Sequence, residues 1–325
     1  MKIDIIGAGS LGLLLAGKLI HAGAEVRLWC RSDEQAGELS RQGITISYEA
    51  GNLPLHLAGG SFRAGPIDEF AETVIRVPGD WTAIMLKQNA FHDTLPEILA
   101  PLRETRLQAV CFQNGNGHLE LLQELLPQAS VWAAVTTEAA KRKSFTEVIH
   151  AGTGETFIGK RSNITTNAAK GGLEEETAAI SLTKALVAAG FRAWMSKEVD
   201  TMIYRKLLIN AVINPLTAIW RIQNGELTAS GERIQLMKEL YREAANVYDA
   251  CGIAYDVDAW EDILEVCRAT SGNTSSMLAD VLASRATEIR WINGSIVEMA
   301  DRAGIAVPLH RWICRLVEGM NVKER

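Results

Sequence analysis

One apolar stretch of the chain carries an ammonium group and two amides at regular spacing. In RKLLINAVINP, residues 205–215, Lys206, Asn210 and Asn214 are four residues apart, and Thr217 follows. Side chains at this spacing share one face of an α-helix, and the apolar residues between them indicate a helix buried on most sides. Such a face is suited to bind and protonate an oxygen that gains negative charge. The simpler interpretation is that Lys206 extends to solvent and that the asparagines lie on a narrow, solvent-exposed face of the helix.

The second half of the chain offers further polar groups for the same chemistry. Ser276, in NTSSML, stands where a long helix is predicted to begin, so it is a candidate N-cap, and a helix N-terminus also suits a carboxylate ligand. Asn273 lies in the same loop. Glu288, in TEIRWING, can bind a hydroxyl or orient Lys206 by charge pairing, or it is a solvated helix charge. Pro215 lacks a backbone donor and predicts a kink that frees backbone carbonyls.

A glycine motif near the N-terminus indicates a dinucleotide site. IIGAGSLG places Gly7, Gly9 and Gly12 between a predicted strand and a predicted helix, which Ser10 and Leu11 begin. The first glycine permits a tight turn, the second lets the backbone approach a pyrophosphate, and the third lets the helix pack closely on the strand. The helix N-terminus then faces the anion. A glycine turn without a ligand is the alternative.

The end of the second predicted strand bears on the choice between NADH and NADPH. In LWCRS the strand ends at Cys30, where NAD sites usually have an acidic residue, and Arg31 follows. A guanidinium pairs with phosphate in a bidentate way. Arg31 therefore favours NADPH, with its 2′-phosphate, although a solvated loop charge is the alternative.

Two later strands end in polar residues. WTAIMLKQ ends a predicted strand with Lys87, and AVCFQNGNG ends another with Asn114. Ligands bind at the carboxyl ends of parallel strands, near the point where the strand order reverses. We therefore expect Lys87 to meet an anionic group and Asn114 to bond to ribose or nicotinamide. A solvated lysine and a plain Asn-Gly turn are the alternatives.

The apolar pattern of the first half predicts the sheet that must hold these groups. A helix is predicted at 10–22, and strands are predicted at 2–6, 25–30, 44–48, 55–58, 73–77, 82–86, 108–112, 131–135 and 145–150. This alternation is typical of a doubly wound parallel sheet with antiparallel additions. Residues 162–172 are polar and rich in turn formers, which predicts an exposed loop.

From about residue 174 the pattern is helical. Helices are predicted at 174–189, 198–220, 231–251, 257–269, 276–303 and 309–320. We therefore predict an α/β Rossmann-type, NADP-binding domain over residues 1–197 and an all-α substrate and catalytic domain over residues 198–325. The apolar helices near the C-terminus leave two interpretations open, a homodimer interface or core.

Composition narrows the class of protein. The 325 residues carry a net charge of −6, which argues against nucleic acid as the main partner. The five cysteines are widely spaced without a CxxC pair, so we expect a reducing cytoplasm and no disulfide scaffold. The six histidines show no metal-ligand spacing, so no metal site is expected. No apolar run reaches the roughly 18 residues that a membrane span needs, and no signal peptide is expected.

Several motifs in fixed order carry a family resemblance. GAGSLG followed by CRS, LK after a strand, QNGNG, RKLLINAVINPLTAI with NGEL, NTSSML, and TEIRWING occur in this order. Together they resemble ketopantoate reductase (2-dehydropantoate 2-reductase), from residue 1 to about residue 310. The glycine motif is generic, whereas the lysine–asparagine helix and the later block are much more specific. Asn116 departs from the pattern, since an apolar residue is commoner there.

The resemblance implies reduction of the small-molecule 2-oxo acid 2-dehydropantoate to (R)-pantoate, with NADPH oxidised to NADP+, in pantothenate and coenzyme A synthesis. It implies an active site in a cleft between the two domains. Lys206 falls on the catalytic lysine and Glu288 on the glutamate of TEI. The matching substrate-side residues are Asn210, Asn214, Asn224 and Ser276, with Asn273 beside them, and the matching cofactor contacts are Arg31, Lys87 and Asn114.

Two other functions stay open at this point. A reductase of another 2-oxo acid could share the same framework, because pocket shape is not visible in the sequence. A non-catalytic NADPH-binding sensor on a borrowed fold is the second alternative. The presence of Lys206, Asn210, Ser276 and Glu288 together argues against a sensor, which does not need an acid–base group aligned with substrate binders. The loop at 137–144 receives no role.

Overall fold

The computed structural model describes residues 1–49, 53–162 and 172–320, and the chain forms two compact units. The α/β unit comprises residues 1–113 and 118–199, and the helical unit comprises the turn 114–117 and the chain from residue 200 onward. No helix in the described ranges is long and apolar enough to span a membrane. Most of the loop predicted at 162–172 lies outside the described residues.

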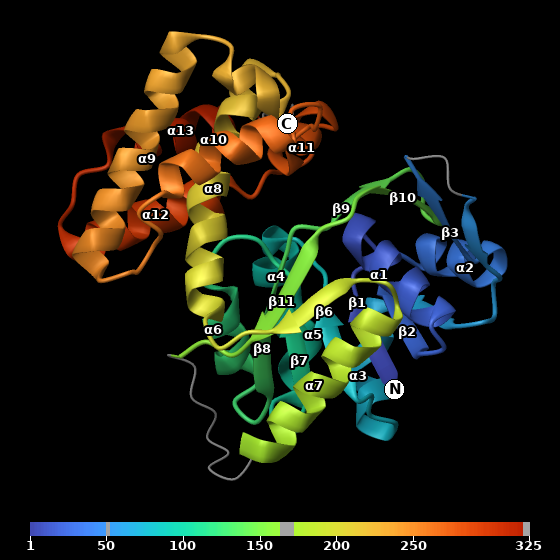
Figure 1. The fold of residues 1–325 in the computed structure, drawn as a ribbon. Helices are drawn as coiled ribbons and strands as arrows, with labels where there is room; N and C mark the ends of the chain where they lie inside the picture. The colour runs from blue at the N-terminus through green and yellow to red at the C-terminus, as the bar shows by residue number, and fades with distance from the viewer. Residues whose placement is uncertain (50–52, 163–171, 321–325) are drawn as a thin grey trace. The chain divides into compact units, whose positions relative to one another are not determined.

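An eight-stranded sheet forms the centre of the α/β unit (Figure 1). Its strands, in spatial order, are β12 (Arg192–Met195), β11 (Glu155–Gly159), β8 (Ser130–Thr136), β7 (Gln108–Cys111), β6 (Trp81–Ile84), β1 (Lys2–Ile6), β2 (Glu25–Cys30) and β5 (Arg63–Pro66). All neighbours pair in parallel except β8 and β11, which are antiparallel. The strand order reverses between β1 and β6, which is where such a sheet binds ligands.

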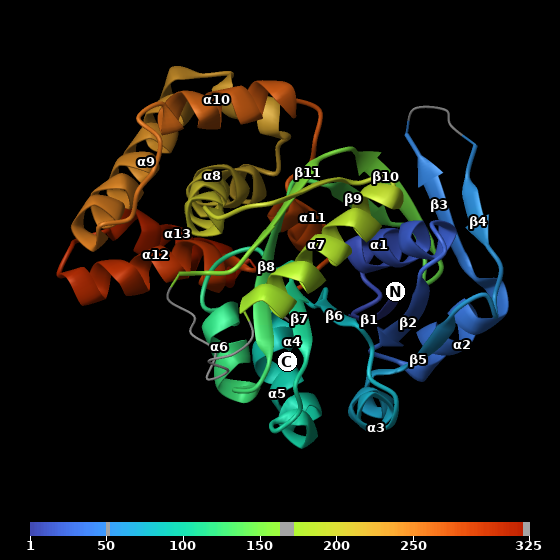
Figure 2. The same ribbon diagram turned by 60° about the horizontal axis from the view of Figure 1, so that its bottom comes forward.

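Helices cover both faces of this sheet (Figure 2). On one face lie α1 (Ser10–His21) and α7 (Gly172–Ala188), and on the other lie α3 (Phe70–Arg76), α4 (Gln88–Asp93), α5 (Leu95–Leu99) and α6 (His118–Leu125). A second sheet packs against α1. Its strands, in order, are β4 (Leu55–Leu57), β3 (Ile44–Tyr48), β10 (Glu147–Gly152) and β9 (Ala139–Arg142), and α2 (Asp33–Gln42) precedes β3 in the chain.

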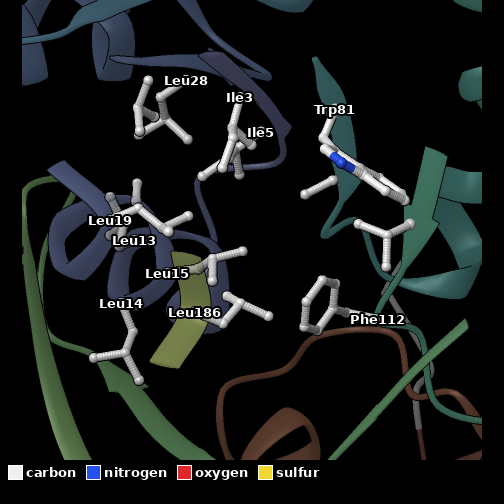
Figure 3. Close-up of a cluster of buried hydrophobic side chains, with 14 of the residues drawn as sticks. Ile3, Ile5, Leu13, Leu14, Leu15, Leu19, Leu28, Trp81, Phe112 and Leu186 are labelled. Carbon is white, nitrogen blue, oxygen red and sulfur yellow. The ribbon is translucent and has the colours of Figure 1, made fainter. Parts of the chain in front are cut away.

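The core of the α/β unit explains why α1 is apolar almost all round. Because α1 lies between the two sheets, every residue from Gly12 to Leu19 is buried. Figure 3 shows Leu15 of this helix beside Leu186 of α7, and Leu13 and Ile5 of β1 belong to the same buried cluster. A helix without a polar face is stable only when it is covered on most sides, so this core fixes the position of the glycine turn that begins α1.

The helical unit is built around α8 (Val199–Trp220). Its other helices are α9 (Gly231–Cys251), α10 (Ala259–Ala269), α11 (Ser276–Leu282), α12 (Ile289–Ala303) and α13 (Pro308–Gly319). Leu207, Leu208 and Val212 of α8 are almost completely buried in a core shared with the other helices. The amphipathic sequence pattern therefore predicted this unit correctly in outline.

Two predicted elements are wrong. Residues 73–77 were predicted as a strand, but Thr73–Arg76 complete helix α3, because Phe70, Ala71 and Val74 are buried together at helical spacing. The single helix predicted at 276–303 is two helices, α11 and α12, separated by residues 283–288. Ser284 has φ of 52° there, which a continuing right-handed helix does not allow. Strands β5, β9, β11 and β12 were not predicted.

Candidate functional site

The glycine turn between β1 and α1 has the geometry of an anion site. Gly7 has φ of +108°, a conformation that favours glycine. A Cβ on Gly12 would lie 1.9 Å from the Gly7 carbonyl oxygen, so the helix can approach the turn only without a side chain there. A Cβ on Gly9 would meet nothing within 4 Å, so the space in front of it is open. Ser10 and Leu11 begin a first turn without acidic residues, which fits a pyrophosphate.

Side chains that the sequence did not single out hold this turn in place. Gln35 Nε2 donates to the carbonyl oxygens of Ala8, at 2.8 Å, and Phe145, at 3.2 Å. Ser10 Oγ accepts a hydrogen bond from the backbone nitrogen of Arg142 at 3.1 Å. The segment 137–144, which received no role from the sequence, contains strand β9, and the last residue of that strand supports the first residue of α1.

Gln113 supports the neighbouring strand ends in a similar way, through side-chain hydrogen bonds to backbone carbonyls. Its Nε2 donates to the carbonyl oxygens of Ile84, at 2.8 Å, and Leu86, at 2.9 Å. These bonds tie the end of β7 to the segment that leads from β6 to Lys87. A glutamine directly before Asn114 at a strand end was the available signal in the sequence.

Arg31 and Lys87 are placed near the carboxyl edge of the sheet by their strands. Arg31 follows β2 directly and is exposed. Cys30, in front of it, is buried, and burial raises the pKa of its thiol to about 12, so this thiol stays uncharged. Lys87 is exposed at the N-cap position of α4.

The turn that carries Asn114 belongs to the helical unit. The backbone nitrogen of Asn116 donates to the carbonyl oxygen of Trp291 on α12 at 3.3 Å. A Cβ on Gly115, which has φ of +86°, would lie 2.4 Å from that same oxygen. From the sequence we expected this turn to belong to the domain of residues 1–197. In the structure it is attached to α12 instead.

Lys206 and Glu288 interact within the helical unit. Lys206 lies on α8 and is partly exposed, whereas Glu288 stands at the N-cap position of α12 and is 8% exposed. Burial lowers the pKa of Lys206 to about 8, and the negative charge of Glu288 opposes that shift. The result is an ammonium group that can lose its proton near neutral pH.

The two asparagines of the stripe keep their amides available. Asn214 is 6% exposed and Asn210 is partly exposed. Neither side-chain amide hydrogen bonds to another residue in the described part of the chain. Thr217, at the end of the stripe, is tied instead to the loop before α11 by a 2.7 Å bond to Ser275 Oγ. Two polar groups on a mostly buried helix, without protein partners, are suited to a polar ligand.

The N-cap of α11 is Ser275, not Ser276. Ser275 Oγ accepts a hydrogen bond from the backbone nitrogen of Leu278 at 3.1 Å, and Ser275 is buried. Ser276 is the first helical residue and is exposed. The capping prediction therefore failed by one residue, because two adjacent serines offer the same signal.

Asn224 and Asn273 lie in contact with each other. The backbone nitrogen of Asn224 donates to the carbonyl oxygen of Asn273 at 3.1 Å, and Asn224 Nδ2 donates to Thr270 Oγ1 at 2.8 Å. The Oδ1 atom of Asn224 is buried and has no partner among the described residues. An amide oxygen of this kind needs a donor to satisfy it.

Among the described residues, no group of three or more His, Cys, Asp or Glu side chains could hold a metal ion. The candidate groups are a glycine turn in the α/β unit, with the geometry that suits an anion, and an ammonium, a carboxylate and several amides in the helical unit.

Comparison with known proteins gives these groups a context. The family model described as "Ketopantoate reductase PanE/ApbA" matches residues 3–163, and the model of its C-terminal part matches residues 198–321. The 2-dehydropantoate 2-reductase of Vibrio cholerae is 31% identical over 312 residues, which cover 95% of this chain and 94% of that protein.

Solved structures have the same fold. A PanE/ApbA family ketopantoate reductase from Ralstonia eutropha aligns with a TM-score of 0.83 at 23% identity, over 99% of this chain and 98% of the other. A D-mandelate dehydrogenase, solved with NADH and anilino(oxo)acetate, aligns with a TM-score of 0.82 at 22% identity, with the same coverage. From the two family models and the near full-length relative, we conclude that the chain belongs to the ketopantoate reductase family of oxidoreductases.

Proposed function

We propose that this protein reduces 2-dehydropantoate (ketopantoate) to (R)-pantoate with NADPH, in the synthesis of pantothenate and coenzyme A. Family membership supports the reaction class. The observation that carries the proposal is Lys206, which shares a helix face with two unpartnered amides and interacts with Glu288.

Lys206 is the proposed general acid. Reduction of a ketone places negative charge on the carbonyl oxygen, and a positioned ammonium stabilises that charge and delivers a proton to the oxygen. A lysine with its pKa near 8 holds that proton at neutral pH and releases it more readily than an ordinary lysine. Bound NADPH supplies the hydride for the carbonyl carbon, so ketone, hydride and one proton together give the alcohol.

The remaining polar groups of the helical unit are proposed to bind the substrate. Asn210, Asn214 and Asn224 have amide groups to donate or accept hydrogen bonds with hydroxyl and carbonyl oxygens. Ser276 and Asn273, both exposed in or beside the first turn of α11, are proposed to meet the carboxylate. We assign Glu288 the task of holding the ammonium group of Lys206 in place through its negative charge.

The α/β unit is proposed to bind NADPH. Its glycine turn provides backbone donors for the pyrophosphate, and Lys87 is a proposed cofactor contact. Asn114 is a further proposed contact and lies on the turn that belongs to the helical unit. The preference for NADPH rests on Arg31, which is exposed directly after β2, and on the absence of an acidic residue at Cys30. A guanidinium at that position suits a 2′-phosphate, whereas an NAD site places a carboxylate there.

The test is a comparison of cofactors and of 2-oxo acids. Ketopantoate-dependent oxidation of NADPH is expected, with a much lower kcat/KM for NADH. The D-mandelate dehydrogenase shows that this fold alone does not choose the substrate. A panel of other branched 2-oxo acids is therefore measured in parallel. Turnover of one of these with little turnover of ketopantoate would replace the substrate assignment, and binding of NADPH without any turnover would favour a sensor.

A further inference from the structure

The break in hydrogen bonding at Pro215 is repaired from another helix. Pro215 lies inside α8 and has no backbone N–H, so the carbonyl oxygen of Ala211 lacks its usual partner four residues later. Asn293 Nδ2, on α12, donates to that oxygen at 2.8 Å. Both Ala211 and Asn293 are 0% exposed. The carbonyl that the sequence predicted to be free is therefore occupied by a buried side chain.

The orientation of this amide is fixed by a second bond. Asn293 Nδ2 also lies 3.1 Å from His310 Nδ1, and His310 Nε2 lies 3.0 Å from the carbonyl oxygen of Leu240. The carbonyl accepts, so the imidazole proton belongs on Nε2, and Nδ1 accepts from Asn293. Burial lowers the pKa of His310 to about 4, which keeps the ring neutral. A flipped amide would place Oδ1 against two acceptors, so only one orientation makes both bonds.

These bonds connect four helices of the helical unit through its interior. They run from α8 through Asn293 on α12 and His310 on α13 to α9, the elements labelled in Figure 1. Ala211 directly follows Asn210 on the helix that also carries Lys206, and Asn293 lies five residues after Glu288. The Asn293–Ala211 bond therefore joins the backbone of the lysine-bearing helix to the helix that Glu288 begins.

We propose that Asn293 is a positioning residue, which holds α8 and α12 in the register that keeps Lys206 beside Glu288. The kinetic part of this inference rests on the proposed function, whereas the geometric part does not. The chain of bonds is directional and buried, so it fixes one arrangement of the two helices where apolar packing alone tolerates small shifts.

The test replaces Asn293 with leucine, which has a similar size and no donor. We expect kcat for ketopantoate to fall about a hundredfold, because a displacement of roughly 1 Å at the reacting groups costs about that much. The KM for NADPH is expected to stay unchanged. The pKa of Lys206, followed by NMR of its side chain, is expected to fall below the wild-type value, since Glu288 no longer raises it.

A control variant separates positioning from loss of stability. The carboxylate of Glu243 accepts hydrogen bonds from the backbone nitrogens of Leu309, at 3.0 Å, and His310, at 3.1 Å, where α13 begins. Glu243→Gln weakens that contact and leaves the Asn293–Ala211 bond intact. It is expected to lower the Tm while kcat and the Lys206 pKa stay at wild-type values.

A second-site change gives the decisive comparison. Pro215→Ala restores a backbone donor for the Ala211 carbonyl. The double variant Asn293→Leu/Pro215→Ala therefore leaves no unpaired carbonyl at Ala211, and it can be measured even if Asn293→Leu alone does not fold. We expect the double variant to recover part of the lost Tm, because His310 Nδ1 still lacks the donor that Asn293 supplied. The Lys206 pKa is not expected to recover, and Pro215→Ala alone is the reference. Recovery of both, or a Lys206 pKa unchanged in Asn293→Leu, overturns the inference. If wild type does not turn over ketopantoate, the proposed function fails, and the NMR titration still tests Asn293.

Discussion

At the scale of single residues, the proposed reaction depends on the protonation state of Lys206. In the proposed reaction, reduction uses the ammonium form of Lys206, and the reverse oxidation of pantoate uses its neutral amine. Both forms are accessible because burial lowers its pKa to about 8 while Glu288 limits the shift. The stripe of polar residues was predictable from the sequence. The depth of burial that sets this pKa was not, because it depends on helices that are distant in the chain.

The pH dependence follows from that pKa. Below about pH 8 Lys206 carries its proton, so kcat/KM for reduction is expected to be level there and to fall as the pH rises above 8. For oxidation of pantoate, kcat/KM is expected to rise through the same range. Initial rates in both directions from pH 6 to about 10 check this. Profiles without opposite slopes near pH 8 would remove Lys206 from the proton transfer.

The proposed preference for NADPH rests on Arg31 and can be tested by substitution. Arg31→Ala is expected to raise the KM for NADPH about tenfold or more, since a hydrogen bond between charged groups contributes about 1.5–3 kcal/mol. The KM for NADH should hardly change, because NADH has no 2′-phosphate. Arg41→Ala, an exposed arginine in the last turn of α2, is the matched control. Equal effects of Arg31→Ala on both cofactors would show that Arg31 does not recognise the phosphate.

At the scale of elements, long periodic segments were predictable and short or irregular ones were not. Strands β1, β2 and β3 and helix α9 have the predicted bounds. The run TVIRV suggested a strand from its β-branched residues, but burial of the face that includes Val74 makes it helical. The break at residues 283–288 contains no glycine or proline. In both cases tertiary contacts determine the secondary structure, because they outweigh the local helix and strand propensities of the residues.

The approach of α1 to β1 gives a prediction at this scale. Gly12→Ala would place a methyl group 1.9 Å from the Gly7 carbonyl oxygen, and backbone atoms must move to relieve that contact. We expect a loss of about 1–3 kcal/mol in the free energy of unfolding, and a loss of NADPH binding in a fluorescence titration.

Gly37→Ala is the control for this substitution. Gly37 lies in α2, is exposed, and has open space where its Cβ would be. Alanine is expected to stabilise the protein there by about 0.5–1 kcal/mol, with NADPH binding unchanged. If Gly12→Ala also kept full stability and binding, the close packing of the glycine turn would not matter for the cofactor.

At the scale of the whole molecule, the sequence indicated two units with different tasks. The chain divides at Val199, yet the turn 114–117 belongs to the helical unit although its strand does not. No sequence pattern marks such an exchange, because it arises from packing of Gly115 and Asn116 on Trp291. Site residues were named from motifs, whereas Gln35, Gln113 and Asn293 emerged only from their hydrogen bonds.

Binding of NADPH is expected to stabilise the protein against unfolding. At a free concentration of about 100 times its dissociation constant, NADPH is expected to add about 2.7 kcal/mol to the free energy of unfolding. Thermal unfolding with NADPH and with NADH at equal concentrations measures this. A larger shift with NADH than with NADPH would contradict the cofactor assignment independently of any turnover.

The most direct test of the proposed function is ketopantoate-dependent oxidation of NADPH by wild type, Lys206→Ala and Lys184→Ala. Lys184 is an exposed lysine on α7 and serves as the matched control. We expect turnover by wild type and Lys184→Ala, and a kcat that is lower by a factor of about a hundred or more in Lys206→Ala, as loss of a general acid requires. Turnover by Lys206→Ala close to that of wild type would contradict the central role of this lysine.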